Sequence, residues 1–524
     1  MSELPKGWVE TTLDELSAYI QRGKSPKYAD KSDLPVVNQK CVRWNGLDRN
    51  YVKYIHPDQF EKWDAVRYLT YGDILWNSTG TGTIGRATFF IPATKSEKLV
   101  VDSHVTIVRP SNLVNPKYVY YWIKSPAIQK KMEDMQSGST NQVELSKTAV
   151  CSTRIPLCPK NEQDRIVAKL DSVFSELNET KTRLNRVPEL LKKFRQSVLD
   201  AACTGKLTED WRKSNAKSGS AIDLLRAIDK EKDKLIKQRK IKKSKVLNKV
   251  EHDEMPFALP SSWAWTRFGE LISRGPTNGI YLPQAKYGDG FPILRIDDFQ
   301  VDWCKKSCEL RKVRANQEEI NRYCLELNDI VINRVNSISH LGKSTVIKEE
   351  NVPALFESNM MSIKVFSEIN PDFIAFWLQS SFGRYFLIKD AKHAVNQASI
   401  NQTDVCRTIT PLPPRLEQIE IVKRVKYLLN QTAKIVDTYE AAKSKIEKTE
   451  PSILKLAFEG RLVEQDSNDE PASVLLERIK SERKTTKKKI IKGTGSKKKK
   501  SKSTSTTSNG DSSSGVSALA AKSR

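Results

Sequence analysis

The chain has 524 residues, of which 38% are hydrophobic and 29% charged, so it can form several domains with buried cores. Its 88 Lys and Arg against 63 Asp and Glu give a formal net charge of +25, which argues against an acidic solvating protein and favours a polyanionic partner. No apolar run approaches the roughly 20 residues that span a bilayer, and the first residues lack a secretion signal. The eight Cys and five His have neither disulfide-scaffold nor zinc-ligand spacing, so we expect a cytoplasmic protein without a bound metal.

The chain is a tandem duplication. A shift of 255 residues places Trp8 on Trp263, and the match continues at both ends of a unit of about 200 residues. The same shift aligns Asn115-Pro116 with Asn370-Pro371, Trp122 with Trp377, Asn141-Gln142 with Asn396-Gln397, Glu162-Gln163 with Glu417-Gln418, and Gly205 with Gly460. One offset that matches at both ends of such a unit is not a bias of composition, although the register drifts by one or two residues in between.

Each repeat begins with a segment of about 150 residues that is typical of a mixed α/β globule. Short runs rich in β-branched residues, separated by Gly, Asn and Ser, predict strands at residues 34–37, 73–76 and 105–108, with counterparts at 291–294, 329–332 and 361–363. The Asn-Pro pairs at 115–116 and 370–371 predict the start of a helix, with Asn as the cap and Pro in the first turn.

The second part of each repeat predicts a long helix with an apolar heptad seam. Its helix-packing positions are Ile166, Leu170, Val173, Leu177, Leu184 and Leu191, and, in the second copy, Ile421, Val425, Leu428, Ile435 and Ile446. Because both seams keep the same phase, we expect the two helices to pack against each other as a coiled coil. The fold that we expect has these two helices antiparallel. The alternative is two ordinary amphipathic helices that cover the globules. Pro188 should break the first helix near Val187, and Pro451 lies late in the second.

Two basic segments follow the long helices. Residues 212–256 are Lys-rich and helical in pattern, and Leu475-Leu476 repeats the pattern of Leu224-Leu225. The segment 481–524 holds 13 Lys and Arg against 2 Asp and Glu in a Ser- and Thr-rich context, so we expect it to be disordered.

Motifs for catalysis are incomplete. Residues 80–85 read Gly-Thr-Gly-Thr-Ile-Gly, but a strand pattern follows where a dinucleotide site needs a helix. The Gly-Lys-Ser at 342–344 lacks the first glycine of a phosphate-binding loop, which would stand at Ser337. The Asn-Pro pairs lack the second proline of an adenine-methyltransferase tetrad, which favours a helix cap. We therefore expect no catalytic residue in this chain.

The polar loops at the ends of the predicted strands are the best candidates for a nucleic-acid interface, because Asn and Gln can pair with adenine edges and Arg and Lys with guanine. The candidate DNA-binding residues are Ser78, Thr79, Thr81, Arg86, Ser139, Asn141, Gln142, Arg334, Asn336, Lys343, Lys392, His393, Asn396 and Gln397. For each of them, an ordinary hydrogen bond within a turn is an equally good interpretation.

The chain resembles the specificity (S) subunits of bacterial type I restriction-modification systems. The resemblance lies in the Leu-Pro-x-x-Trp opening of both repeats, the Pro-Leu-x-Pro-x-x-Glu-Gln entry to each long helix, and the Gly-Lys-Leu-Thr-Glu-Asp-Trp-Arg stretch at 205–212. It covers the chain from Leu4 to about Lys480. The basic segment after Lys480 departs from the family pattern, and no role is carried onto it.

The resemblance implies an α+β fold with two target recognition domains, at residues 1–155 and 257–410, each followed by helical regions at 156–256 and 411–480 before the tail at 481–524. Each recognition domain would read one half of a split DNA site. Two modification (M) subunits would dock on the helices, and restriction (R) subunits would join them. S-adenosylmethionine, ATP and Mg would then belong to these partners, with no cofactor in this chain. Two alternatives stay open: a coiled-coil scaffold that binds only proteins, and an enzyme whose active site cannot be read from the sequence.

Overall fold

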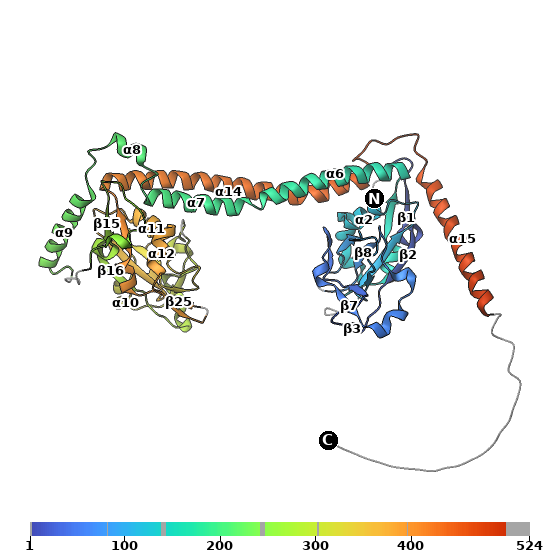
Figure 1. The fold of residues 1–524 in the computed structure, drawn as a ribbon, viewed down its shortest axis with the longest axis horizontal. Coiled ribbons are helices and arrows are strands. Elements are labelled where there is room, and N and C mark those ends of the chain that lie inside the picture. The colour runs from blue at the N-terminus through green and yellow to red at the C-terminus, as the bar shows by residue number, and fades with distance from the viewer. Residues whose placement is uncertain are drawn as a thin grey trace, which may run out of the picture. The chain divides into compact units, whose positions relative to one another are not determined.

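The computed structural model describes residues 3–80, 82–137, 143–241, 247–300, 303–395 and 397–498. The chain divides into two units: unit 1 is Met1–Lys181 with Lys443–Arg524, and unit 2 is Thr182–Ala442. Each unit holds one of the duplicated globules, parts of the long helices, and one further helix (Figure 1). We call residues 9–157 globule 1 and residues 264–412 globule 2.

Globule 1 is built on two four-stranded sheets. The first is antiparallel, in the order β2 (Ser17–Arg22), β11 (Val105–Pro110), β8 (Ile74–Asn77) and β9 (Ala87–Phe89). The second is mixed, in the order β10 (Val100–Val101), β4 (Pro35–Val37), β7 (Lys53–Ile55) and β3 (Tyr28–Ala29). Three two-stranded ladders join β1 (Val9–Thr12) to β14 (Arg154–Leu157), β5 (Val42–Arg43) to β6 (Gly46–Leu47), and β12 (Gln136–Ser137) to β13 (Glu144–Leu145). The helices are α1 (Leu13–Leu16), α2 (Pro116–Lys124), α3 (Pro126–Gln129), α4 (Met132–Met135) and α5 (Lys147–Ser152), with 3-10 turns at Arg49–Tyr51, Pro57–Lys62 and Ala65–Arg67.

Globule 2 repeats the antiparallel sheet and the closing ladder of this plan, whereas its mixed sheet has three strands. Its antiparallel sheet has the order β16 (Ile272–Asn278), β23 (Met360–Val365), β19 (Ile330–Asn333) and β21 (Ser344–Val346), and its mixed sheet the order β18 (Arg311–Val313), β17 (Tyr287–Leu294) and β22 (Leu355–Phe356). The ladder β15 (Ala264–Arg267) to β26 (Ile409–Leu412) closes the globule. A third sheet has the order β20 (Val335–Asn336), β25 (Gln397–Ser399) and β24 (Lys392–Ala394) and corresponds to the β12–β13 ladder of globule 1 with one more strand. The helices are α10 (Gln317–Tyr323), α11 (Pro371–Gln379), α12 (Ser381–Ile388) and α13 (Gln402–Arg407), with 3-10 turns at Phe268–Leu271, Gln284–Lys286, Ser307–Glu309 and Glu349–Asn351. Another 3-10 turn, His252–Glu254, precedes the globule.

The expected domain boundaries at 155 and 410 fall inside β14 and β26. These strands belong to the globules, because β14 pairs along its length with β1 and β26 with β15. The sequence alone does not show whether such a strand ends the globule or begins the next segment. Only its pairing with a distant strand shows that it belongs to the globule.

Both Asn-Pro pairs cap a helix, as expected. The Asn115 side chain accepts a hydrogen bond from the Lys117 amide, and Asn370 accepts one from Asp372. The Gly-rich residues after β8 form a turn that leads into strand β9, and Lys343 leads into strand β21. Neither segment precedes a helix, so neither has the geometry of a phosphate-binding loop.

The long helices are α6 (Lys160–Leu184), α7 (Val187–Cys203) and α14 (Arg415–Phe458). Pro188 stands in the first turn of α7, which explains the break after Leu184, because proline lacks the N–H that would continue the helix. Pro451 lies inside α14 without ending it.

The helices pack antiparallel in each unit, as expected. In unit 1, Lys181 pairs with Glu450 at 3.2 Å while Arg165, at the other end of α6, pairs with Asp469 at 2.7 Å. The seam is buried next to the globules: Ile166, Leu170, Ile421 and Val425 have no exposed surface, and Val173, Leu177, Leu184, Leu191, Leu428 and Ile446 are half-buried.

Ile435 departs from the expected seam, because its side chain is 49% exposed. A straight helix with 3.6 residues per turn drifts by about 20° per heptad from a repeat of 3.5. Two heptads separate Ile421 from Ile435, so the apolar stripe has turned away from its partner there.

A further helix packs on each globule: α9 (Ala221–Lys237) in unit 2 and α15 (Ala472–Lys498) in unit 1. Lys232 of α9 pairs with Glu270 at 2.7 Å, and Lys480 of α15 approaches Glu15 at 3.7 Å. A short helix, α8 (Glu209–Ser214), precedes α9. Helix α15 therefore continues beyond the expected boundary at 480, and residues 499–524 of the expected tail lie outside the described residues. No helix in the described part of the chain is long and apolar enough to cross a membrane.

One buried carboxylate differs between the units. Glu417 accepts hydrogen bonds from Trp263 Nε1 at 2.8 Å, Thr208 Oγ1 at 2.8 Å and Arg212 Nε at 3.0 Å. Its counterpart Glu162 accepts one from Trp8 Nε1 at 3.0 Å. Burial raises the pKa of Glu162, an effect that Trp8, Gln465 and Arg165 offset in part. The unfolded chain therefore loses the Glu162 proton more readily than the folded chain does. At pH values above the raised pKa, the ionised Glu162 carboxylate lowers the free energy of unfolding.

We expect the same substitution to have opposite effects at these two positions. Glu162→Gln should stabilise unit 1 at neutral pH, and the gain should disappear as the pH falls through the raised pKa and Glu162 itself becomes protonated. Glu417→Gln should destabilise unit 2 by about 2–3 kcal/mol, because it leaves the Arg212 guanidinium without its counter-charge. Hydrogen exchange in peptides covering residues 5–12 and 260–267 measures each unit separately. Equal shifts at both sites would contradict this account, and exposed Glu440→Gln is the control.

Candidate nucleic-acid interface

The candidate residues fall into two loops in each globule, residues 78–86 and 139–142 in globule 1 and residues 334–343 and 392–397 in globule 2. In each globule the first loop pairs with the strand at the end of the second. In globule 1 the Leu145 amide donates to the Ser78 carbonyl at 2.8 Å, and Thr79 forms a β-bridge with Glu144. In globule 2 the loop after β19 becomes strand β20, which pairs with β25. The paired loops are some 60 residues apart in sequence, so their meeting at one edge in both copies defines one candidate surface per globule.

The candidate residues of globule 1 differ in exposure. Ser78 is fully buried, with its hydroxyl 2.5 Å from that of Thr106, so it supports the loop from inside. Thr79 is half-buried and lies 2.6 Å from Nδ1 of His104. Arg86 is half-buried and donates to the Val42 and Gly82 carbonyls at 3.4 and 3.3 Å. The candidates Thr81, Ser139, Asn141, Gln142 and, in globule 2, Asn396 lie outside the described residues.

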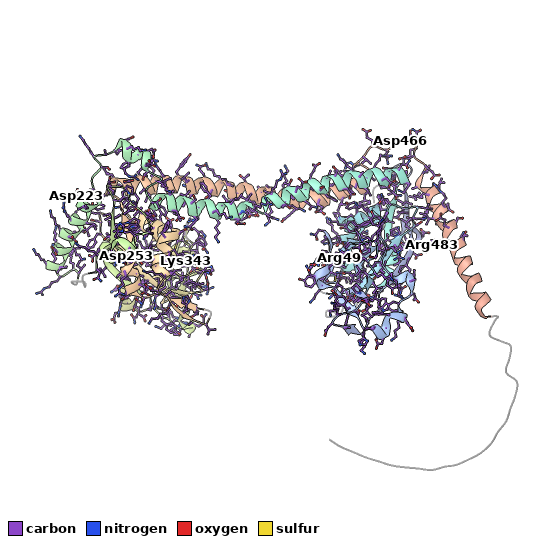
Figure 2. All side chains as sticks on the ribbon, viewed as in Figure 1. Arg49, Asp223, Asp253, Lys343, Asp466 and Arg483 are labelled. Atoms are coloured by element: carbon purple, nitrogen blue, oxygen red, sulfur yellow. The ribbon has the colours of Figure 1, made fainter. Side chains whose placement is uncertain are left out.

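Three candidates of globule 2 hold the loop in shape. Lys343, whose place in the chain is labelled in Figure 2, donates to the carbonyls of Ile296 and Phe299, both at 2.8 Å. Burial lowers the pKa of its ammonium group. Arg334 donates to the Ser358 carbonyl at 3.2 Å, and the Asn336 side chain accepts from the Ser337 amide at 2.7 Å. These hydrogen bonds to the backbone favour a positioning role over a direct contact with DNA, although Arg334 Nε has no partner among the described residues.

Lys392, His393 and Gln397 are the best-placed candidates. All three are exposed on the hairpin of β24 and β25, where His393 lies opposite Ala398 and Ala394 opposite Gln397. Their side chains have no hydrogen bond or ion pair with other described residues, and Val395 at the hairpin end is 92% exposed. A two-stranded ribbon that carries free donors and acceptors can enter a major groove.

Sequence reasoning missed a second contribution to the surface of globule 1. His104, which contacts Thr79, follows β10, and Gln39 Oε1 lies 3.5 Å from Thr79 Oγ1. Ser25 bonds to Ser103 at 2.8 Å and closes the same edge. These residues come from three separate loops with no shared sequence motif. Their proximity could therefore be predicted only from the order of the strands in the sheets.

The chemistry of the described residues offers little for catalysis. They include no group of three or more His, Cys, Asp or Glu that could hold a metal ion. Burial raises the pKa of the Cys41 thiol to about 11 and that of Cys304 to about 12, which keeps both protonated and unreactive at neutral pH.

Comparisons with known proteins agree with this geometry. A family model described as type I restriction modification DNA specificity domain matches residues 5–188 and 278–450. The specificity subunit of the type I restriction enzyme StySPI from Salmonella potsdam is 28% identical over 512 residues, covering 93% of this chain and 99% of the relative. That of EcoKI from Escherichia coli K12 is 25% identical, covering 92% and 96%.

Two solved structures share the fold. The HsdS subunit from Thermoanaerobacter tengcongensis superposes with a TM-score of 0.51 at 18% identity, covering 88% of this chain and 98% of that one. A chain from a study of complex assembly and conformational transition of the type I R-M system reaches a TM-score of 0.62 at 16% identity, covering 88% and 100%.

Proposed function

Because the chain belongs to the type I restriction modification DNA specificity family, we propose that it is the sequence-specific DNA-binding subunit of a type I restriction-modification complex. Each globule reads one half of an asymmetric, bipartite site. The long helices set the spacing between the half-sites and dock two M subunits. The chain is non-catalytic, and methyl transfer and ATP-dependent cleavage belong to the M and R subunits.

The observation that carries this proposal is the repeated convergence of two polar loops at one edge of each globule. The two edges are built on the same sheet framework from diverged residues: Thr79 and His104 in globule 1, and Lys392, His393 and Gln397 in globule 2. A duplicated scaffold with different polar tips suits a protein that reads two different sequences. The net charge of +25 adds a sequence-independent attraction to phosphates.

The cofactors follow from this division of labour. S-adenosylmethionine, ATP and Mg bind to the M and R subunits, and this chain supplies target selection. We place the complex in the cytoplasm, where the DNA is.

We expect two substitutions in the hairpin of globule 2 to separate affinity from specificity. With the M subunits present, Lys392→Ala should weaken binding to all duplexes and lower the slope of log K against log salt by about 1. Gln397→Ala should cost about 1–3 kcal/mol on the recognised site and little on random DNA.

Fluorescence anisotropy with specific and random duplexes at several salt concentrations measures both effects. Lys230→Ala, an exposed change on α9, is the control. Weak, salt-insensitive binding that none of these changes affects would instead favour a scaffold that binds only proteins.

A further inference from the structure

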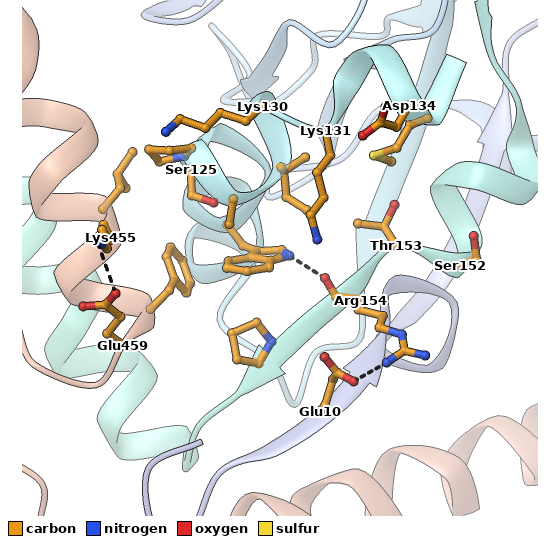
Figure 3. A pocket seen from close by; sticks show the side chains of 18 of the residues that line it. Glu10, Ser125, Lys130, Lys131, Asp134, Ser152, Thr153, Arg154, Lys455 and Glu459 are labelled. Atoms are coloured by element: carbon orange, nitrogen blue, oxygen red, sulfur yellow. Dashed lines mark hydrogen bonds and ion pairs between the residues drawn. The ribbon is translucent and has the colours of Figure 1, made fainter. Parts of the chain in front are cut away.

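Unit 1 contains an open apolar groove with a volume of about 700 Å³ (Figure 3). Trp122 and Phe458 form its floor, with ring centroids 4.9 Å apart, and Leu4, Leu454 and Met135 extend it. Trp122 is fixed, because its Nε1 donates to the Arg154 carbonyl at 2.8 Å. The groove therefore presents rigid aromatic surface to solvent.

A buried hydroxyl also lines this groove. Ser125 is 1% exposed, and its Oγ has no hydrogen-bond partner among the described residues. The counterpart Ser380 in unit 2 donates to the Trp377 carbonyl at 2.7 Å and accepts from the Gly383 amide at 3.1 Å. A buried hydroxyl without a hydrogen-bond partner costs free energy, because it has lost its bonds to water. The Ser125 hydroxyl could regain such a bond from a group that enters the groove.

The equivalent site in unit 2 is filled by the chain itself. Phe257 lies 5.1 Å from Trp265 and 5.0 Å from Phe382, and Trp265 lies 5.9 Å from the fully buried Trp377. These rings cover the tryptophan that matches Trp122. The segment that leads to Phe257 passes over the globule, with Leu247 next to Gly269.

Unit 1 has small or charged residues where unit 2 has these three rings. Glu10 stands opposite Pro156 in its ladder, just as Trp265 stands opposite Pro411. Ala127 holds the position of Phe382, two residues after the matching caps Ser125 and Ser380. The offset of the duplication places Ser2, which lies outside the described residues, at the position of Phe257. The cavity is the space that these rings would fill.

The segment that covers Trp377 in unit 2 indicates which kind of segment would fit the groove of unit 1. Residues 251–257 read Glu-His-Asp-Glu-Met-Pro-Phe, an acidic stretch that ends in the inserted ring. Charged residues of both signs line the groove in unit 1, but Glu10 pairs with Arg154 at 2.7 Å and Glu459 approaches Lys455 at 3.7 Å. Lys130, Lys131 and Asp134 remain exposed and without an ion pair among the described residues, so the unpaired charge of the rim is positive. The chain's own C-terminal segment does not match, since residues 481–524 are strongly basic and contain no aromatic residue.

We propose that the groove of unit 1 docks an acidic, extended segment of a partner protein, which inserts one aromatic side chain against Trp122. The rim lysines pair with its carboxylates. Because unit 2 closes its own site with Phe257, one such segment binds per chain. This inference does not depend on the proposed function.

The test uses a labelled peptide with the sequence of residues 250–259, Val-Glu-His-Asp-Glu-Met-Pro-Phe-Ala-Leu, and the full-length chain. Fluorescence anisotropy should show saturable binding of one peptide per chain. The same peptide with F257A should bind at least about tenfold weaker, since burial of an aromatic side chain is worth more than 1.4 kcal/mol. Absence of saturable binding, two sites per chain, or equal affinity for both peptides would overturn the proposal.

Two variants locate the site. The double substitution Glu10→Trp and Ala127→Phe copies unit 2 and should fill the groove and abolish binding. Lys130→Glu with Lys131→Glu changes only exposed positions, so it tests the site even if the filled variant misfolds, and it should weaken binding at least about tenfold. Unchanged binding to the lysine variant would overturn the proposal.

Other occupants give distinct results. If deletion of residues 499–524 raises the affinity for the peptide, the chain's own end fills the groove. If sedimentation shows a dimer that the lysine variant dissociates, a second copy fills it. Either result would overturn a partner segment as the occupant.

Discussion

Replacing residues 9–157 with the matching globule of a relative is expected to change one half of the recognised DNA site and to leave the other half and the spacer as they were. Base contacts are local to the loops of one globule, whereas the spacing belongs to helices that the exchange does not touch. The graft must carry both β1 and β14, because their ladder closes the globule. It must also keep Trp8 and Asn115, which bond to Glu162 and Gln163 of α6 at 3.0 Å each.

The readout of this exchange is a genome-wide map of methylated adenines, made with the M subunits present. The reciprocal exchange of residues 264–412 is the matched control and should change only the other half-site. A change in both half-sites, or in neither, would contradict the assignment of one reader to each globule.

Lengthening the helices should have the converse effect. One heptad inserted between residues 184 and 187 and one in the facing part of α14 add about 10 Å at 1.5 Å per residue, or about three base pairs of spacer at 3.4 Å each. Both insertions are needed, because the helices run antiparallel. The half-sites should stay unchanged, since the seven added residues rotate the helix to within about 20° of its starting face.

An insertion of five residues at the same points is the control for the heptad. At about 100° per residue it turns the following segment by about 140° from its original face, so the two globules can no longer meet one side of the duplex. We expect specific methylation to be lost. A spacer that stays constant after the heptad insertion would show that the helices do not set the spacing.

Features with a short-range cause could be predicted from the sequence. The Asn115 and Asn370 caps and the break at Pro188 depend on residues that are neighbours in the chain, and the structure has each of them. The duplication could be predicted because it is a direct match of residues at a fixed offset. The packing of the long helices against each other followed from two seams in the same phase. Ile435 departs from that seam because the drift of a helix against a heptad repeat accumulates with length.

The candidate site could be predicted only in outline. The loops that meet in each globule were identified, but the direction of each side chain was not. Ser78 is turned into the sheet toward Thr106, 28 residues away, and Lys343 reaches the Phe299 carbonyl, 44 residues away. A shift of one residue along a strand turns a side chain from one face to the other, so burial at these positions depends on pairings that the sequence does not display. The groove at Trp122 could not be predicted from the sequence, because it depends on which residues of each unit pack against Trp122 and Trp377.

The most direct test of the central claim, that this chain reads DNA at two separate places, is the methylated-adenine map of the natural chain with its M subunits. We expect one asymmetric motif of two specific blocks separated by a spacer of fixed length and arbitrary sequence. In that map, Gln397→Ala should relax positions in a single block. A continuous motif without a spacer, or methylation without any sequence preference, would contradict the account.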